Sequence, residues 1–139
     1  MQKQLLSGKI HTARLTHCEI NYEGSLEIDG DYLEAAKILP YEKILVVNRN
    51  NGSRLETYAI PGANGSKRFC LNGPAAHLGS VGDVVTIMAF SIFNEEECKT
   101  HKPRVIDPIA AMSSTALSVI LIQSLDFGSW FKGMPFFIW

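Results

Sequence analysis

Residues 43–60 read KILVVNRNNGSRLETYAI and contain the strongest hairpin signal in the chain. An aliphatic segment, Lys43 to Asn48, precedes the turn residues Asn50-Asn51-Gly52, and a second segment, Arg54 to Ile60, follows them. Asn-Gly favours the positive φ angles that tight turns between antiparallel strands require. The two segments are therefore predicted to pair as a β-hairpin.

Similar short segments lie on both sides of this hairpin. The other predicted elements are strands at Lys9 to Thr16, Ser25 to Ile28, Phe69 to Leu71 and Val84 to Phe90, and helical segments at 32–37 and 73–78. Asp31 is predicted to cap the first helix, because Glu34 follows three residues later as in a capping box. Glu95-Glu96-Glu97 suits the first turn of another helix. Many short strands with small helices indicate a mainly β fold, a compact barrel or sandwich.

The composition of the 139-residue chain changes near its last quarter. Residues 1–104 have the charge content of an ordinary globular domain, whereas residues 105–139 carry only Asp107, Asp126 and Lys132 as charged side chains. We predict a barrel domain over 1–104 and an atypical apolar C-terminal extension of unknown role over 105–139.

The uncharged stretch 109–125 is as long as the shortest membrane-spanning helices, which need about 17–25 apolar residues. Ser113, Ser114, Thr115 and Gln123 interrupt it, however, and no basic cluster marks one of its ends. These features favour a segment that packs on the body, lies across an oligomer interface or is poorly ordered over a membrane anchor.

Charge and cysteine content exclude several classes of protein. The net charge of −1 gives no basic footprint for nucleic acid. Cys18, Cys70 and Cys98 form no closely spaced pair or Cys/His cluster, so neither a zinc site nor a disulfide framework is expected. The N-terminus lacks the apolar core of a signal peptide, and a cytoplasmic location is therefore expected.

Gly24-Ser25 is the first candidate for chemistry. Gly-Ser occurs five times in the chain, and such pairs are normally turn residues. Ser25 differs in its position, because it follows a tight Tyr22-Glu23-Gly24 approach and enters a strand at once. A serine hydroxyl beside a strained peptide carbonyl can attack that carbonyl, and glycine at position 24 leaves the attack uncrowded.

Two predicted strands carry polar residues on a common face. Arg54 and Tyr58 share one face of their strand while Thr57 points to the other, and Lys9 and His11 share a face of the first strand. Arginine binds carboxylates through paired hydrogen bonds, tyrosine can donate a proton, and a Lys/His pair can line an anion pocket. The alternative in both places is an ordinary solvated strand face or edge.

The turn Asn72-Gly73-Pro74-Ala75-Ala76 leads into a helical segment, with Pro74 near its first position. Backbone N–H groups at this turn could hold a carboxylate, although a plain helix start explains the same residues. His17, His77 and His101 show no metal-ligand spacing, and no metal site is predicted.

In this order and at these intervals, the motifs resemble the aspartate decarboxylase family, the pyruvoyl enzymes of pantothenate biosynthesis. The matching segments, within about residues 1–104, are GKIH at 8–11, NYEGS at 21–25, NGSRLETY at 51–58, NGPAAH at 72–77, VGDVV at 81–85 and HKP at 101–103. The resemblance implies a double-psi β-barrel and a homotetramer with active sites between neighbouring subunits.

The resemblance also implies a proenzyme that cleaves itself between Gly24 and Ser25 and converts Ser25 into a pyruvoyl group, with no external cofactor. That group would form a Schiff base with L-aspartate and act as the electron sink for loss of CO2, giving β-alanine. Tyr58 would return a proton, and Arg54 would bind a substrate carboxylate. The other implied site residues are Thr57 for cleavage and substrate contact, Lys9 and His11 as pocket lining, and Asn72, Gly73, Pro74 and Ala75 for the rest of the site.

Two features depart from the family pattern. Pro74 stands where the family usually has alanine, which removes one backbone donor from the turn. The residues after Arg104 match no family pattern and represent either an extension or the product of a shifted reading frame.

A non-catalytic small β-barrel that serves as a binding module is the alternative to the enzyme.

Overall fold

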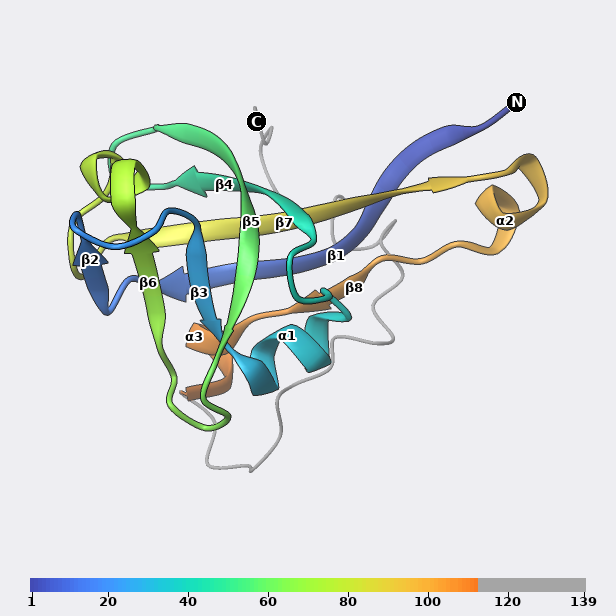
Figure 1. Ribbon diagram of the computed structural model, residues 1–139. Helices are drawn as coiled ribbons and strands as arrows, with labels where there is room; N and C mark the ends of the chain where they lie inside the picture. Colours follow the sequence, from blue (N-terminus) through green and yellow to red (C-terminus); the bar gives the residue numbers. More distant parts are fainter. Residues whose placement is uncertain (113–139) are drawn as a thin grey trace.

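The computed structural model describes residues 1–112, and its strands form one eight-stranded sheet in the order β2-β6-β3-β5-β4-β7-β1-β8 (Figure 1). The strands are β1 (Lys3–Arg14), β2 (His17–Glu19), β3 (Leu26–Asp29), β4 (Lys43–Asn48), β5 (Arg54–Gly62), β6 (Phe69–Asn72), β7 (Val84–Phe93) and β8 (Arg104–Ile106). The helices are α1 (Gly30–Ala36), the 3-10 helix η1 (Gly73–Leu78), α2 (Glu95–Thr100) and α3 (Pro108–Met112).

The chain passes directly from β1 to β2 at the far end of the sheet, and Thr16 between them donates its backbone N–H to Phe69 of β6 at 2.8 Å. This connection closes the sheet, and the predicted mainly β, double-psi barrel is confirmed.

The predicted hairpin is formed by β4 and β5. β4 has the predicted bounds, and the antiparallel register pairs Val47 with Arg54 and Lys43 with Tyr58. Gly52 in the connecting turn has a φ of +75°, a conformation that glycine adopts without the steric cost other residues meet.

The barrel is filled by the alternate residues of its strands. Ile44 and Val46 point inward and are 1% exposed, whereas Leu45 and Val47, which alternate with them, are half-buried on the outer face. Strand residues from both ends of the chain complete this core, namely Ile10, Ala13, Leu26, Ile28, Leu71, Val85, Ile87 and Ile106. Since these residues are far apart in sequence, the core fixes which strands become neighbours.

Several boundaries differ from the sequence predictions. Asp29, and not Asp31, is the N-cap of α1, because the Asp29 carboxylate accepts the backbone N–H groups of Asp31 at 2.9 Å, Gly65 at 3.0 Å and Lys67 at 2.6 Å. Strands β2 and β8 were not predicted, since three residues are too few to show a periodic pattern.

The packed body continues past residue 104. β8 pairs in parallel with β1, and its Ile106 is 1% exposed within the core. α3 then packs against β1, so residues 105–112 of the apolar extension are part of the folded body. Most of the uncharged stretch 109–125, and the question of a membrane anchor with it, lies outside the described residues; no helix within 1–112 has the length and hydropathy to cross a membrane.

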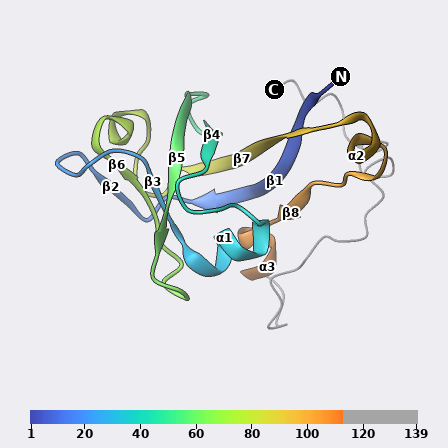
Figure 2. The ribbon, with the colours of Figure 1, turned by 45° about the vertical axis from the view of Figure 1, so that its right-hand side comes forward.

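Strands β1 and β7 extend beyond the barrel as a two-stranded arm that ends at α2 (Figures 1 and 2). The predicted helix start at Glu95-Glu96-Glu97 is confirmed. The Asn94 side chain accepts the backbone N–H of Glu97 at 2.9 Å, and the Glu97 carboxylate accepts that of Asn94 at 2.8 Å. This capping box satisfies donors that the first turn would otherwise leave unpaired.

Candidate active site

Ser25 has a strained backbone and a buried hydroxyl. Its φ is 85°, and no other serine within residues 1–112 has a positive φ. Such a conformation in a non-glycine residue costs of order 1–3 kcal/mol. The residue is 3% exposed, and its Oγ has no hydrogen-bond partner in the described chain. These properties separate Ser25 from Ser53, Ser66 and Ser80, the serines of the other described Gly-Ser pairs, which lie in loops outside the helices and strands.

The sheet register places Ser25 between two other predicted site residues. Leu26 pairs in parallel with Ala59 of β5 and antiparallel with Leu71 of β6. One residue earlier, the same register sets Ser25 beside Tyr58 on one side and Asn72 on the other. The Asn72 backbone N–H donates to the Ser25 carbonyl at 2.9 Å, which ties the two residues together.

Gly73 lies against the segment that precedes Ser25. A Cβ at position 73 would lie 2.8 Å from both the Gly24 nitrogen and the Tyr22 carbonyl oxygen, and Gly73 has a φ of +61°. Glycine is required here both by the backbone conformation and by the close approach of the two segments. A Cβ at Gly24 itself would meet nothing within 4 Å, so packing does not demand glycine at that position.

The rest of the turn after Asn72 forms η1, as predicted. Pro74 is exposed in its first turn, whereas Ala75 and Ala76 are buried. Proline is well suited to this position, because the first N–H groups of a helix have no partner within the helix. Pro74 is therefore compatible with the local fold.

The alternation predicted along β5 is observed. Arg54 and Tyr58 are exposed, and Thr57 is half-buried on the opposite face, across from Ile44. β5 lies inside the sheet between β3 and β4, so an edge-strand explanation of its charged residues does not apply. Arg54 is four residues from Tyr58, or about 13 Å along the strand, and thus lies outside the Ser25 cluster.

Lys9 and His11 lie elsewhere on the barrel. Their strand β1 is separated from β5 by β4 and β7, which is roughly 14 Å of sheet at ordinary strand spacing. Lys9 is only 8% exposed, so β1 does not present an ordinary solvated face there. One chain therefore forms two groups of predicted site residues, one around Ser25 and one around Lys9.

Burial is the main cause of the shifted pKa values in the group around Lys9. It lowers the pKa of Lys9, with Arg49 lowering it further and Asp107 opposing the shift. The pKa of His11 is lowered by burial and by the nearby Lys9, and Asp107 again opposes the shift while Arg49 adds to it. The neutral forms of both side chains are thus favoured relative to the same groups in water.

Residues 1–111 match the family model described as aspartate decarboxylase. The chain belongs to the aspartate decarboxylase family. Proteins named aspartate 1-decarboxylase from Bacillus licheniformis (strain ATCC 14580) and from Staphylococcus aureus strains JH9 and Newman are each 53% identical to it over 105 residues. Those residues are 76% of this chain and 83% of each relative, and the predicted family is confirmed.

Three residues that contact or lie near the predicted site residues were not predicted from the sequence: Arg49 and Asp107 near Lys9, and Cys70 at Asn72. Asp107 accepts a hydrogen bond from the Thr12 hydroxyl and caps α3 by accepting the Ala110 N–H at 3.2 Å. The Asp-Pro pair was a visible helix-start signal, but its place against β1 depends on the tertiary structure. Among residues 1–112, no group of three or more His, Cys, Asp or Glu side chains is placed to hold a metal ion.

Proposed function

We propose that the chain is a self-processing, pyruvoyl-dependent decarboxylase that converts L-aspartate to β-alanine and CO2 for pantothenate biosynthesis. The observation that carries this proposal is the state of Ser25, a buried hydroxyl with no partner in the described chain on a residue held at a φ of 85°. The reaction itself is proposed from the name of the relatives, aspartate 1-decarboxylase.

Self-cleavage follows from the position of this hydroxyl beside the Gly24 carbonyl. The Ser25 Oγ bonds to the Gly24 carbonyl carbon, the Gly24–Ser25 C–N bond breaks, and the hydroxyl proton ends on the Ser25 nitrogen. Loss of the Ser25 Cα proton then breaks the Cβ–Oγ bond and releases Gly24 as a carboxylate. Water hydrolyses the remaining enamine through its imine, releasing ammonia and leaving the pyruvoyl carbonyl. The backbone strain at Ser25, of order 1–3 kcal/mol, favours the first step.

The surroundings of Ser25 fit a pyruvoyl group, since the side chain is buried and its one polar atom is unpaired. Once formed, the group supplies an electron sink for loss of the α-carboxylate. Tyr58, which the register sets opposite Ser25 on the neighbouring strand β5, donates a proton to the substrate carbon. Asn72 and the turn from Gly73 through Pro74 to Ala75 form the adjacent wall, and Thr57 serves cleavage and substrate contact. Arg54, Lys9 and His11 lie away from Ser25 within one chain, so in this proposal a neighbouring subunit supplies them: Arg54 anchors the remaining substrate carboxylate through paired hydrogen bonds, and Lys9 and His11 line the pocket.

The purified protein is expected to separate into two pieces, residues 1–24 and residues 25–139, and to form β-alanine from L-aspartate. Intact-mass spectrometry detects the cleavage and the pyruvoyl terminus, and proton NMR of the reaction mixture detects β-alanine. A single uncleaved chain after prolonged incubation, with no β-alanine, would instead support the non-catalytic barrel.

We also propose that the active site is completed between subunits of a homotetramer. The sheet order supports this, because β5, β4 and β7 lie between β3, which begins next to Ser25, and β1, which carries Lys9 and His11. A cytoplasmic location is proposed with it, from the composition and the substrate.

Co-expression of Lys9→Ala and Ser25→Ala chains tests the shared site. Alone, Lys9→Ala is expected to lose roughly 10–100-fold in activity, the cost of a charged hydrogen-bond partner, and Ser25→Ala to be inactive. Mixed oligomers, purified through a different tag on each chain, should contain sites with an intact Ser25 and an intact Lys9. Their β-alanine formation should exceed that of either variant, and a mixture no more active than Lys9→Ala would contradict the shared site.

A further inference from the structure

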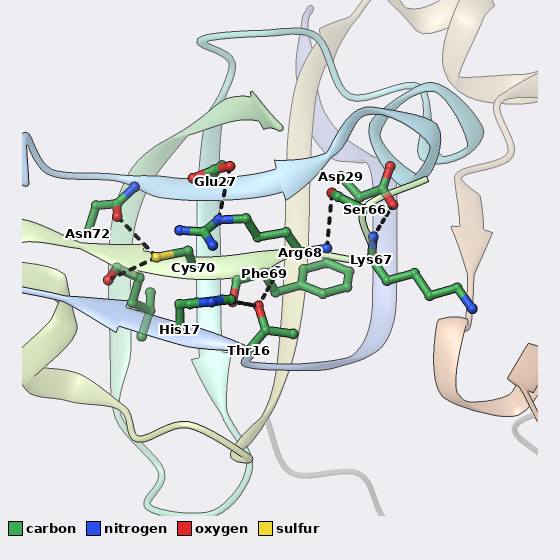
Figure 3. A network of polar contacts seen from close by, with 11 residues as sticks. Thr16, His17, Glu27, Asp29, Ser66, Lys67, Arg68, Phe69, Cys70 and Asn72 are labelled. Atoms are coloured by element: carbon green, nitrogen blue, oxygen red, sulfur yellow. Dashed lines mark hydrogen bonds and ion pairs between the residues drawn. The ribbon is translucent and has the colours of Figure 1, made fainter. Parts of the chain in front are cut away.

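Cys70 lies on β6 within the sheet that holds Ser25. It pairs with Glu27 of β3, two steps along the register from the Ser25 and Asn72 pair, and is fully buried. Its Sγ lies 3.1 Å from the Asn72 Oδ1 and 3.8 Å from the Leu71 carbonyl oxygen. Figure 3 shows the thiol directed at the amide of Asn72.

The Asn72 amide is satisfied on one side only. Its Oδ1 accepts the thiol of Cys70, whereas its Nδ2 is buried with no hydrogen-bond partner in the described chain. Ser25, directly across the strand pair, has a buried Oγ that is also unpaired. Buried polar atoms are nearly always paired, so two orphans on facing residues indicate a place where a reacting group is bound or formed.

The thiol determines which end of the Asn72 amide is left without a partner. An asparagine side chain can turn about its last torsion between two orientations of similar shape, one of which exchanges donor and acceptor. A protonated thiol donates only to the oxygen, which leaves the NH2 group free on the other side. Burial raises the pKa of the Cys70 thiol, with Arg68 opposing the shift and Glu27, Glu19 and Cys18 adding to it, so the donor form persists at neutral pH.

We propose that Cys70 is a positioning residue for the self-cleavage, because its thiol holds the Asn72 amide with the NH2 donor directed toward Ser25. The inference rests on the proposed function. Attack on the Gly24 carbonyl develops negative charge on oxygen, and a fixed N–H donor beside the reacting residues stabilises that charge, whereas a reversed amide would present a repelling oxygen.

The test compares Cys70→Ala with Cys70→Ser in freshly folded precursor. Cys70→Ala removes the thiol that orients the amide and is expected to slow cleavage at least about tenfold, because complete loss of one donor to a developing oxyanion costs about 100–1000-fold. Cys70→Ser keeps a donor at the same position and should restore cleavage to within a few fold of the wild type. Cys18→Ala is the matched control, since the Cys18 thiol lies on β2 and faces the Gly79 carbonyl at 3.6 Å.

Intact-mass time courses give the rates, and thermal unfolding of each variant checks the fold. Wild-type cleavage rates in Cys70→Ala, or a Cys70→Ser variant as slow as Cys70→Ala, would overturn the inference. Absence of cleavage in the wild type would contradict the proposed function instead.

A second measurement does not depend on cleavage. In the Ser25→Ala precursor, the side-chain NH2 resonances of Asn72 should shift when Cys70→Ala is added and return toward their original positions with Cys70→Ser. The Cys18→Ala change should leave them in place. Unchanged Asn72 resonances in the Cys70→Ala precursor would show that the thiol does not hold the amide.

Discussion

Ser25→Ala is expected to leave the Gly24–Ser25 peptide bond intact and to reduce decarboxylation below about a thousandth of the wild-type rate. The substitution removes the hydroxyl that attacks the Gly24 carbonyl and, with it, the source of the pyruvoyl group. The Cβ and the backbone stay the same, and the lost Oγ has no hydrogen-bond partner in the described chain. The variant should therefore fold, and mass spectrometry should find one full-length chain.

Ser80→Ala is the matched control for this variant. Ser80 also follows a glycine, but it is exposed and has no positive φ. Its substitution should change neither cleavage nor activity, because the backbone at Ser80 is not held in the strained conformation seen at Ser25. Retained decarboxylation in a folded, uncleaved Ser25→Ala protein would refute the pyruvoyl mechanism.

Gly73→Ala is expected to slow self-cleavage about 100-fold, the order of loss that a displacement of about 1 Å produces in a reacting geometry. The new Cβ would lie 2.8 Å from backbone atoms of Tyr22 and Gly24, which cannot rotate away as a side chain can. The segment before Ser25 must therefore move. Cleavage half-times from intact mass, together with thermal unfolding, measure the two effects.

Gly82→Ala separates this contact from simple backbone strain. Gly82 has a φ of +95°, but a Cβ there would meet nothing within 4 Å. The variant should lose of order 1–2 kcal/mol of stability through the left-handed conformation alone. Its cleavage rate should stay at the wild-type value. If both glycine variants slow cleavage equally, stability and not the contact with the Gly24 segment governs processing.

Local patterns in the sequence were sufficient for much of the fold. The Asn-Gly turn and its flanking strands were located correctly, as was the short helix from Gly73 to Leu78. The alternation that exposes Arg54 and Tyr58 was also correct. Each of these features depends on neighbouring residues, since side-chain period and turn chemistry act over a few positions.

The failures share a cause in contacts between distant segments. Asp29 caps α1 because the loop at Gly65 and Lys67 brings two further N–H groups to its carboxylate, which no local pattern signals. β2 and β8 exist because β6 and β1 offer backbone partners to three-residue segments. Their bounds follow from pairing and not from periodicity.

The sequence by itself determined the mainly β class, the faces of the strands and the motif in which Gly24-Ser25 is embedded. Only the tertiary structure decided that Ser25 is buried at a φ of 85°, that Tyr58 and Asn72 flank it, and that Lys9 lies several strands away. The physical reason is the placement of β3 between β5 and β6. Residues near 25, 58 and 72 meet because their strands bury one common core, and that choice is made by the whole barrel.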